Sequence, residues 1–428
     1  MKPLPRLEGA LVKLLGSALI DQALLSACNF LVSVLLIRMA ADHQYGYYVL
    51  ATNAVLLLVT LQNAFFGAPL VNALTRRPLA EHAPLVEGLN HDQQRYLLLA
   101  VALCLAVAAA GWISGLLAGE TALVLAAFGL LMLCMLTREF FRAVLIARRC
   151  THDVLRADAM YVAVLVAGVC IAARGPAPAA AALVAMSLAA LAGVAILRRA
   201  ARSASLLGAA GTPGTLRRLA PLGAWAAAGG AIHWTFSQGY SYLVAGTLDL
   251  AAVAAIAAIR LLMMPLNLLS TGMYQLMMPT VSRWLHDHGP QLVLKRLLLV
   301  AAAFMAVAAL YFVVVWLLRE WIFGSLLKKQ FEQRDLLLCL WAGIFFLMVM
   351  RDQLIFLPVL AERFRELAGL ALACAVLALS VSFIAVQRHG APGALLGMLV
   401  GEAADLAGIL YLGWRETRLP RPAPLLAA

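Results

Sequence analysis

The sequence predicts an all-α polytopic membrane protein with about 12 transmembrane helices, arranged as two parallel-repeat six-helix lobes. Three observations predict this fold: composition, the length of the apolar runs, and an internal repeat. The 428-residue chain is 64% hydrophobic and 13% charged, with a mean hydropathy of +0.91, so it has too little polar surface for a water-soluble globule of this size. Its apolar runs reach about 20 residues, the length at which a helix crosses a bilayer with its backbone groups hydrogen-bonded internally.

The internal repeat consists of segments that match at a nearly constant offset. Thr137-Arg138-Glu139 and Met350-Arg351-Asp352 each lie deep in an apolar run, and they are 213 residues apart (351 − 138). Two further pairs agree: Phe30-Leu31-Val32 with Tyr242-Leu243-Val244 at 212 residues (242 − 30), and Ala68-Pro69 with Met278-Pro279 at 210 residues (278 − 68). Such an offset indicates a duplicated module. Duplicated multi-helix halves are typical of secondary transporters, whose sites lie between the halves near the membrane midplane.

Twelve apolar runs are expected to span the membrane, six on each side of a polar linker. In order, they are residues 17–40, 46–72, 96–118, 121–147, 155–173, 178–197, 219–247, 251–281, 295–318, 335–360, 366–386 and 391–412. The linker contains SASLLGAAGTPGT, which combines flexible Gly and Ser with a Pro turn. The expected domains are therefore an N-terminal lobe (1–197), an inter-lobe linker (198–218) and a C-terminal lobe (219–428). Six spans per lobe is an even number, so the two repeats enter the membrane in the same orientation.

Lys and Arg residues set the expected orientation. With the N-terminus inside, 24 of the 33 fall in segments on the cytoplasmic side and seven on the other, while Arg260 and Arg351 lie inside spans. Because Lys and Arg are retained on the cytoplasmic side, both termini are expected to be cytoplasmic. Basic loops beside an anionic leaflet also account for the net charge of +12, so the bilayer is the expected partner and nucleic acid is not.

The seven cysteines predict no metal site. They are odd in number, lie in or beside the spans, and show neither paired nor metal-ligand spacing. We interpret them as small apolar packing residues. No cofactor is expected.

Three stretches of the chain resemble one transporter family. Asp21 to Tyr47, Arg138 to Asp158 and Ala258 to Ser282 are similar to the first two helices, the fourth and fifth, and the eighth of bacterial polysaccharide flippases of the Wzx type. These flippases form the polysaccharide transporter family, in the superfamily that also holds multidrug extruders and the lipid II flippase. The match covers most of the chain at the level of pattern.

This resemblance implies a function as well as a fold. It implies two six-helix lobes in a V shape with a central cationic cavity, in the bacterial inner membrane. It implies passage of an undecaprenyl-pyrophosphate-linked oligosaccharide from the cytoplasmic to the periplasmic leaflet, for O-antigen or exopolysaccharide synthesis, with a polysaccharide polymerase and a chain-length regulator as further partners. The chain lacks helices beyond twelve, which lipid II flippases are expected to carry, so a peptidoglycan precursor is the less favoured cargo.

Four arginines are the candidates for contacting diphosphate or acidic sugar: Arg38, Arg138, Arg260 and Arg351. Charges at membrane depth are costly and usually face a cavity or each other, and guanidinium presents a fork of donors to phosphate oxygens. Arg260 has no acidic neighbour in sequence, which favours a substrate contact. Arg138 beside Glu139, and Arg351 beside Asp352, are equally consistent with structural ion pairs, Arg351 also with Glu402 or Asp405 as its partner. Arg38, near the outer end of the first span, is equally consistent with snorkelling to the interface.

Three acids are the candidates for coupling to a proton or sodium gradient: Asp21, Glu402 and Asp405. Glu402 and Asp405 are three residues apart on one helix face, a spacing that lets two carboxylates bind a cation or share a proton. Neutralisation of an arginine in the second lobe is the favoured alternative, because intramembrane charges are usually paired.

Polar residues recur at helical spacing on the first helix of each lobe. They are Gln22, Ser26 and Asn29 in one lobe, and His233, Ser237 and Gln238 in the other. We interpret Gln22, Asn29 and Gln238 as lining a hydrophilic groove for sugar hydroxyls, although hydrogen bonds between helices explain any one of them. Gly393, Gly397 and Gly401 repeat every four residues and predict close helix packing.

Three classes of function were weighed against these features. A flippase of lipid-linked oligosaccharide, working by alternating access, is favoured. A multidrug or small-molecule ion-coupled antiporter of the same fold is the alternative, but it should place acids in its cavity to hold organic cations. A membrane enzyme is not expected, because the chain has neither a long outside loop with catalytic Arg or His nor a His-centred intramembrane site. No catalytic residue is therefore assigned.

Overall fold

The computed structural model describes residues 5–211 and 214–418, and within these ranges the secondary structure is helical, with no strand. The chain divides into two compact units, Met1–Trp234 and Thr235–Ala428. Eleven helical segments of the described residues are long and apolar enough to cross a membrane. The expected all-α, multi-pass fold is confirmed. The remaining expected span is the seventh, residues 219–247, and the helix that covers it, α8 (Thr215–Thr247), is not among the eleven, because it carries polar residues such as His233 and Gln238.

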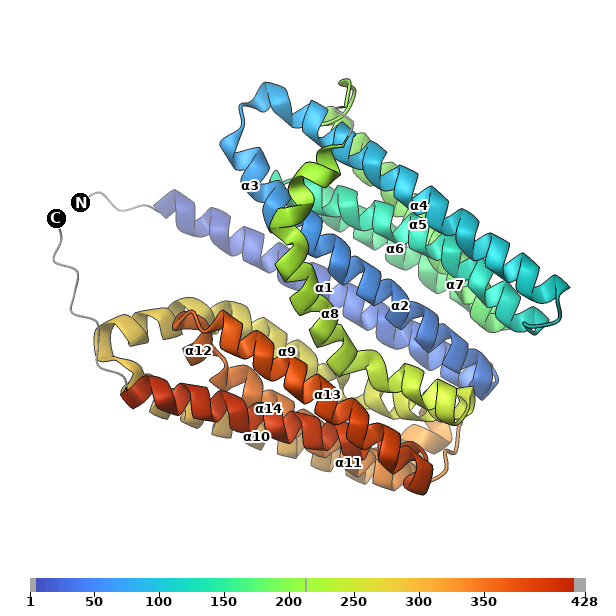
Figure 1. Ribbon diagram of the computed structural model, residues 1–428, viewed down its shortest axis with the longest axis vertical. Coiled ribbons are helices and arrows are strands. Elements are labelled where there is room, and N and C mark those ends of the chain that lie inside the picture. Colours follow the sequence, from blue (N-terminus) through green and yellow to red (C-terminus); the bar gives the residue numbers. More distant parts are fainter. Residues whose placement is uncertain (1–4, 212–213, 419–428) are drawn as a thin grey trace. The chain divides into compact units, whose positions relative to one another are not determined.

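The N-terminal unit is a bundle in which α4, α5, α6 and α7 run side by side (Figure 1). Its elements are α1 (Pro5–Met39), α2 (Asp42–Phe66), α3 (Ala68–Arg76), the 3-10 helix η1 (Leu79–Glu81), α4 (His82–Ile113), α5 (Gly119–Ala147), α6 (Thr151–Ala172), α7 (Pro178–Ser203) and the first part of α8. A core of fully buried apolar residues, including Phe140, Phe141, Val144 and Leu197, joins α5 to α7.

The C-terminal unit consists of the rest of α8 and the helices that follow it. Its elements are α9 (Leu250–His288), α10 (Pro290–Trp321), the π-helix η2 (Ile322–Leu326), α11 (Arg334–Leu354), α12 (Phe356–Leu360), α13 (Phe364–His389) and α14 (Ala391–Arg418). The predicted close packing of the glycine series is confirmed. A Cβ atom at Gly393, Gly397 or Gly401 would meet the backbone or side chains of α13, at Ala385, Ser382 and Ala378 respectively.

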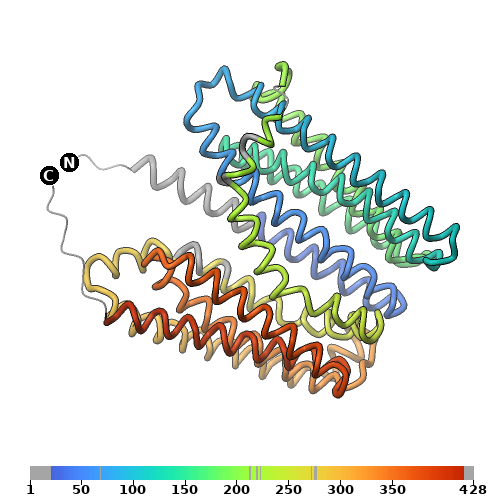
Figure 2. Tube along the Cα trace, viewed as in Figure 1, coloured from blue at the N-terminus to red at the C-terminus, as the bar shows by residue number. Residues whose placement is uncertain are grey.

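Two expected spans are broken where a proline follows. The span expected over residues 46–72 is divided at Gly67, between α2 and α3, and the span over 335–360 is divided at Ile355, between α11 and α12 (Figure 2). Proline lacks the N–H that would bond to the carbonyl four residues earlier. Pro69 and Pro358 remove the bonds to residues 65 and 354, which lie at or next to the two helix ends.

Large apolar side chains remain exposed on both units, as a bilayer requires. Leu103 and Ile171 in the N-terminal unit, and Leu299 and Leu317 in the C-terminal unit, are each at least 65% exposed. Exposed apolar surface this extensive is not found on soluble proteins. The protein is a multi-pass membrane protein.

The connection between α7 and α8, expected to be flexible, is anchored on α4. The Glu87 carboxylate accepts a hydrogen bond from the Gly208 N–H at 3.0 Å, and Leu206 is buried in the same core as α4 residues. A Cβ atom at Gly211 would lie 2.7 Å from the Gly88 backbone nitrogen, so glycine permits the close approach. Residues 212 and 213 lie outside the described residues. The glycines of this linker therefore allow it to pack against α4 as well as to turn.

Asp92 of α4 caps the beginning of α8. Its two carboxylate oxygens accept hydrogen bonds from the N–H groups of Gly214 at 3.2 Å and Leu216 at 3.0 Å. The first N–H groups of a helix have no partner within the helix, and a carboxylate there satisfies them and complements the positive end of the helix dipole.

Replacing Asp92 with alanine should loosen this connection. Loss of a helix cap costs about 1 kcal/mol, so hydrogen exchange at the amides of Gly214 and Leu216 should accelerate several-fold. Hydrogen exchange read by mass spectrometry on the full chain measures it. Asp153→Ala is the control, because Asp153 forms only a 3.9 Å ion pair with Arg156 within α6. Equal exchange in all three proteins would mean that Asp92 is not the cap.

The boundary between the two units lies inside α8 and not in the linker. Trp234, the last residue of the N-terminal unit, donates its indole N–H to the Asn53 carbonyl of α2 at 2.9 Å. Gly223 lies so close to α2 that its Cβ would approach the Ala64 carbonyl oxygen to 2.6 Å. The first part of α8 is thus held on α2 by its own residues. The assignment of residues 1–197 and 219–428 to separate lobes remains a prediction.

Candidate functional site

Five charged side chains form a buried network in the N-terminal unit, here called the N-terminal charge cluster. Its members are Asp21 of α1, Arg138, Glu139 and Arg142 of α5, and Asp158 of α6. Arg138 forms ion pairs with Asp158 and, at 2.6 Å, with Glu139. Arg142 contacts Asp158 at 2.8 Å and also pairs with Asp21. The network links three helices, α1, α5 and α6.

Asp158 is the centre of this cluster. Its side chain is completely buried and accepts from both guanidinium groups. Arg138 is also buried, and its guanidinium carbon lies 4.1 Å from the centre of the Tyr161 ring, so one face of the cation rests on an aromatic surface. Arg138 is therefore held by two carboxylates of its own unit, while its buried Nε has no hydrogen-bond partner among the described residues.

Four charged side chains form a second network, here called the C-terminal charge cluster. Arg351 of α11 donates to Glu402 of α14 at 2.7 Å and to its neighbour Asp352 at 3.0 Å, with Asp405 of α14 at 3.6 Å. Arg351, Glu402 and Asp405 are all buried. The structure thus brings together three residues that the sequence placed as separate candidates for substrate and ion contacts.

Each cluster contains a buried arginine, but the helices that supply its carboxylate partners differ between the two clusters. In the N-terminal unit the carboxylates outside α5 come from α1 and α6, whereas in the C-terminal unit they come from α14 alone. In the predicted repeat α7 is the counterpart of α14, and on α7 Gly193 lies beside the arginine: a Cβ there would be 3.5 Å from Arg138 Cδ and Nε. Each unit thus contains a buried arginine with carboxylate partners, and different helices supply those carboxylates in the two units.

Arg260 differs from these arginines because its described partners are neutral. It lies in the middle of the apolar segment Leu250–Ser270 of α9 and donates to the Gln238 side-chain oxygen at 2.6 Å and to the Tyr240 hydroxyl at 3.4 Å. Its guanidinium carbon is 5.4 Å from the centre of the Trp341 ring. Among the described residues no carboxylate forms an ion pair with Arg260, and its side chain is only partly buried.

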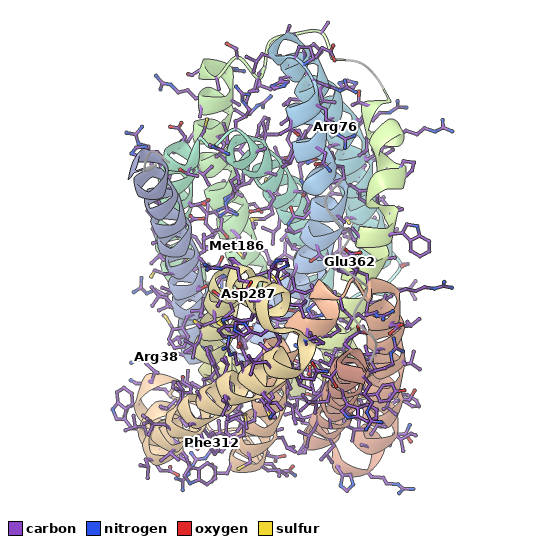
Figure 3. All side chains as sticks on the ribbon, turned by 90° about the vertical axis from the view of Figure 1, so that its left-hand side faces the viewer. Arg38, Arg76, Met186, Asp287, Phe312 and Glu362 are labelled. Atoms are coloured by element: carbon purple, nitrogen blue, oxygen red, sulfur yellow. The ribbon has the colours of Figure 1, made fainter. Side chains whose placement is uncertain are left out.

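The remaining predicted residues are on the surface of α1. Arg38 lies exposed in the last turn of α1 (Figure 3), and no carboxylate of the described part of the chain pairs with it. Gln22 and Asn29 are exposed as well, whereas Gln238, their expected counterpart, is buried and engaged by Arg260. Gln22 and Asn29 remain predicted groove residues.

Sequence reasoning missed Arg142, Asp158, Tyr240 and Trp341. Arg142 follows Arg138 by four residues, a spacing that places both on one helix face and could have paired them. Trp341 lies well inside an apolar run, away from the span ends where interfacial aromatics gather, which was a second usable signal. Asp158 offered no local signal, because its partners come from another helix.

No metal site emerges from this arrangement: among the described residues, no group of three or more His, Cys, Asp or Glu side chains could hold a metal ion. The charged residues instead form two clusters in which each arginine has carboxylate partners, and one arginine, Arg260, with neutral partners. The first two can hold helices together. The third can bind an anion.

Solved transporter structures share this fold. The inward-facing conformation of a multidrug resistance MATE family transporter of the MOP superfamily has a TM-score of 0.72, at 12% identity over 92% of this chain and 94% of that one. The lipid II flippase MurJ in an inward closed conformation also has a TM-score of 0.72, at 10% identity over 94% and 87%. The Vibrio cholerae MATE transporter VcmN in its bent form has a TM-score of 0.57, at 13% identity over 95% and 96%.

These likenesses establish the fold, that of two-lobed transporters of the MATE and MurJ kind. No protein-family model and no curated protein matches the sequence. At identities of 10–13% the substrates of the neighbours do not transfer to this chain.

Proposed function

We propose that the protein is a flippase that moves undecaprenyl-pyrophosphate-linked oligosaccharide repeat units from the cytoplasmic to the periplasmic leaflet for surface polysaccharide synthesis, by alternating access. The observation that carries this proposal is Arg260. A full positive charge at the centre of an apolar helix, bonded to neutral groups, is expensive unless it serves a ligand. The ligand that suits it is an anion, and guanidinium matches phosphate oxygens in particular.

The proposed cargo has three parts with different needs. Its polyprenyl tail can stay in the bilayer, whereas the diphosphate and the glycan cannot cross hydrocarbon unaided. The protein need only supply a polar path with a cation along it. The fold shared with a lipid II flippase supports a lipid-linked cargo of this kind. The ion pairs of Arg138 and Arg351 leave Arg260 as the best-supported anion contact of the three.

A multidrug antiporter is the alternative, and the MATE likeness favours it. Such a transporter needs acids free to hold organic cations. In this chain Asp21, Glu402 and Asp405 each lie within 4 Å of an arginine, which speaks against that use. Carboxylates nevertheless outnumber guanidinium groups in both clusters: the N-terminal charge cluster has three carboxylates and two guanidinium groups, and the C-terminal charge cluster has three carboxylates and one. Coupling to a proton or sodium gradient at these acids is part of the proposal.

The remaining elements of the proposal follow from the proposed cargo. The membrane is the bacterial inner membrane, both termini are cytoplasmic, and a polysaccharide polymerase and a chain-length regulator act on the exported units. The protein is proposed to be a carrier and not an enzyme, in keeping with its transporter fold.

Depletion of the protein in its native host tests the proposal against the antiporter. Lipid-linked repeat units should accumulate, surface polysaccharide should fall, and accumulation of a cationic dye such as ethidium should not change. Mass spectrometry of the extracted polyprenyl-linked glycans and dye fluorescence measure the two outcomes in the same cells. Raised dye accumulation with normal lipid-linked glycan would replace the flippase with the antiporter.

A further inference from the structure

We propose that Gln238 is a positioning residue that keeps Arg260 available as an uncompensated cation for an anionic group of the cargo. This inference rests on the proposed function and changes the role of Gln238, which the sequence placed among groove residues. Gln238 is 6% exposed, so it has little surface to offer a sugar. Its side-chain oxygen is instead held by the Arg260 guanidinium at 2.6 Å.

The surroundings of Arg260 form a neutral cradle, defined by Gln238 and Tyr240 of α8 and Trp341 of α11. Trp341 is itself fixed, since its indole N–H donates to the Ile256 carbonyl at 3.0 Å and its ring contacts Tyr240 edge-on at 5.8 Å. Ile256 precedes Arg260 by one turn of α9. The cradle therefore contacts the guanidinium from two helices of the same unit, α8 and α11, without adding a negative charge.

The neutrality of the cradle is what distinguishes it from the two charge clusters. In each cluster a carboxylate accepts from the buried arginine, as Glu402 does from Arg351 at 2.7 Å. A cargo anion would have to displace that carboxylate. This displacement is costly, because the attraction between unlike charges is strong at low dielectric. An amide oxygen orients the guanidinium at a similar distance but leaves its charge intact. Changing the Gln238 amide to a carboxylate would therefore convert the neutral cradle into an arginine–carboxylate pair like those of the two charge clusters.

Two substitutions at Gln238 separate charge from bonding. Gln238→Glu is nearly isosteric and strengthens the bond to Arg260, yet it cancels the charge. Gln238→Met removes the bond but keeps the cradle neutral. If Gln238 positions a free cation, transport should fall about tenfold or more with Glu and only a few-fold with Met, tenfold corresponding to about 1.4 kcal/mol. If Gln238 is merely structural, the order reverses, because Met loses the hydrogen bond and Glu improves it.

The chain offers a matched control at Gln330. There the same kind of bond occurs, from Arg334 to the Gln330 side-chain oxygen at 2.6 Å, but the pair is exposed and Arg334 already pairs with Glu320 and Asp335. Gln330→Glu adds a carboxylate to an arginine in the same way. Export should stay at the wild-type rate, because this arginine is compensated before the change.

Binding by the purified full chain in nanodiscs identifies which anion the cradle serves. The probes are undecaprenyl diphosphate without sugar and an alkyl glucuronide without phosphate. Wild-type protein should bind one of them, and Gln238→Glu should weaken that binding about tenfold or more, while Gln330→Glu leaves it unchanged. Binding of the diphosphate places the lipid headgroup at Arg260, and binding of the glucuronide places an acidic sugar there.

The two proposals fail in different ways. If depletion of the protein leaves lipid-linked glycan at its normal level, the flippase itself is wrong. If depletion gives the flippase phenotype but Gln238→Glu supports export and binds both probes as wild type does, the cradle is wrong and the flippase stands. Greater loss with Gln238→Met than with Gln238→Glu would also overturn the cradle.

Discussion

Replacing Arg260 with alanine should abolish export of the surface polymer while leaving the amount of protein in the membrane normal. Arg260 takes part in no carboxylate pair of the described residues, so its removal strands no buried anion and should cost little stability. Arg260→Lys should restore only part of the export, because an ammonium group lacks the planar fork that contacts two phosphate oxygens at once. Surface polymer staining and membrane immunoblots measure the two outcomes together.

Arg334→Ala is the control for this experiment. Arg334 forms ion pairs with Glu320 and Asp335 whose acids are exposed, and such pairs contribute about 0–1 kcal/mol. Export should persist in that variant. Normal export by Arg260→Ala would show that Arg260 does not bind an anionic group of the cargo.

Replacing Asp158 with alanine should cause the largest loss of stability of any single charge substitution. It leaves Arg138 and Arg142 without their shared, fully buried carboxylate, and an uncompensated buried charge costs about 3–5 kcal/mol. The variant should reach the membrane at much reduced levels and unfold at lower temperature in detergent. Size-exclusion profiles after a temperature series provide the measurement.

The acid five residues earlier on α6, Asp153, supplies the comparison. Asp153 lies in the first turn, 40% exposed and 3.9 Å from Arg156, so Asp153→Ala should leave stability within about 0.5 kcal/mol of wild type. Equal stability of the two alanine variants would show that the N-terminal charge cluster does not hold α1, α5 and α6 together.

Hydrophobicity alone located nearly all of the helices. A long apolar segment in lipid must satisfy its backbone N–H and C=O groups internally, and a helix does so. The predicted start of the sixth span at Pro178 and of the twelfth at Ala391 coincide with the starts of α7 and α14. The breaks at Gly67 and Ile355 were missed because apolar content continues across them, although the following prolines were visible. The docking of the linker could not be predicted, since it depends on Glu87 and Asp92 more than a hundred residues away.

The candidate site was predictable where a charge interrupts an apolar run. Arg138, Arg260 and Arg351 were all selected on that ground, and the pairing of Arg351 with Glu402 was foreseen as an alternative. What the sequence could not show is which arginine is compensated. From the sequence alone, the free-energy cost of burying Arg138 and that of burying Arg260 look the same. Only the fold brings Asp158 to Arg138 and Gln238 to Arg260.

Leaflet-resolved labelling of the lipid-linked glycan in depleted cells tests the central claim most directly. A membrane-impermeant reagent that modifies the glycan from outside reports only units that have crossed to the periplasmic leaflet. As the protein is depleted, the proposed flippase predicts that outer-leaflet label falls while total lipid-linked glycan rises, and that Arg260→Ala fails to restore the label. Outer-leaflet glycan that appears at the normal rate, together with rising accumulation of a cationic drug, would contradict the flippase and support the antiporter.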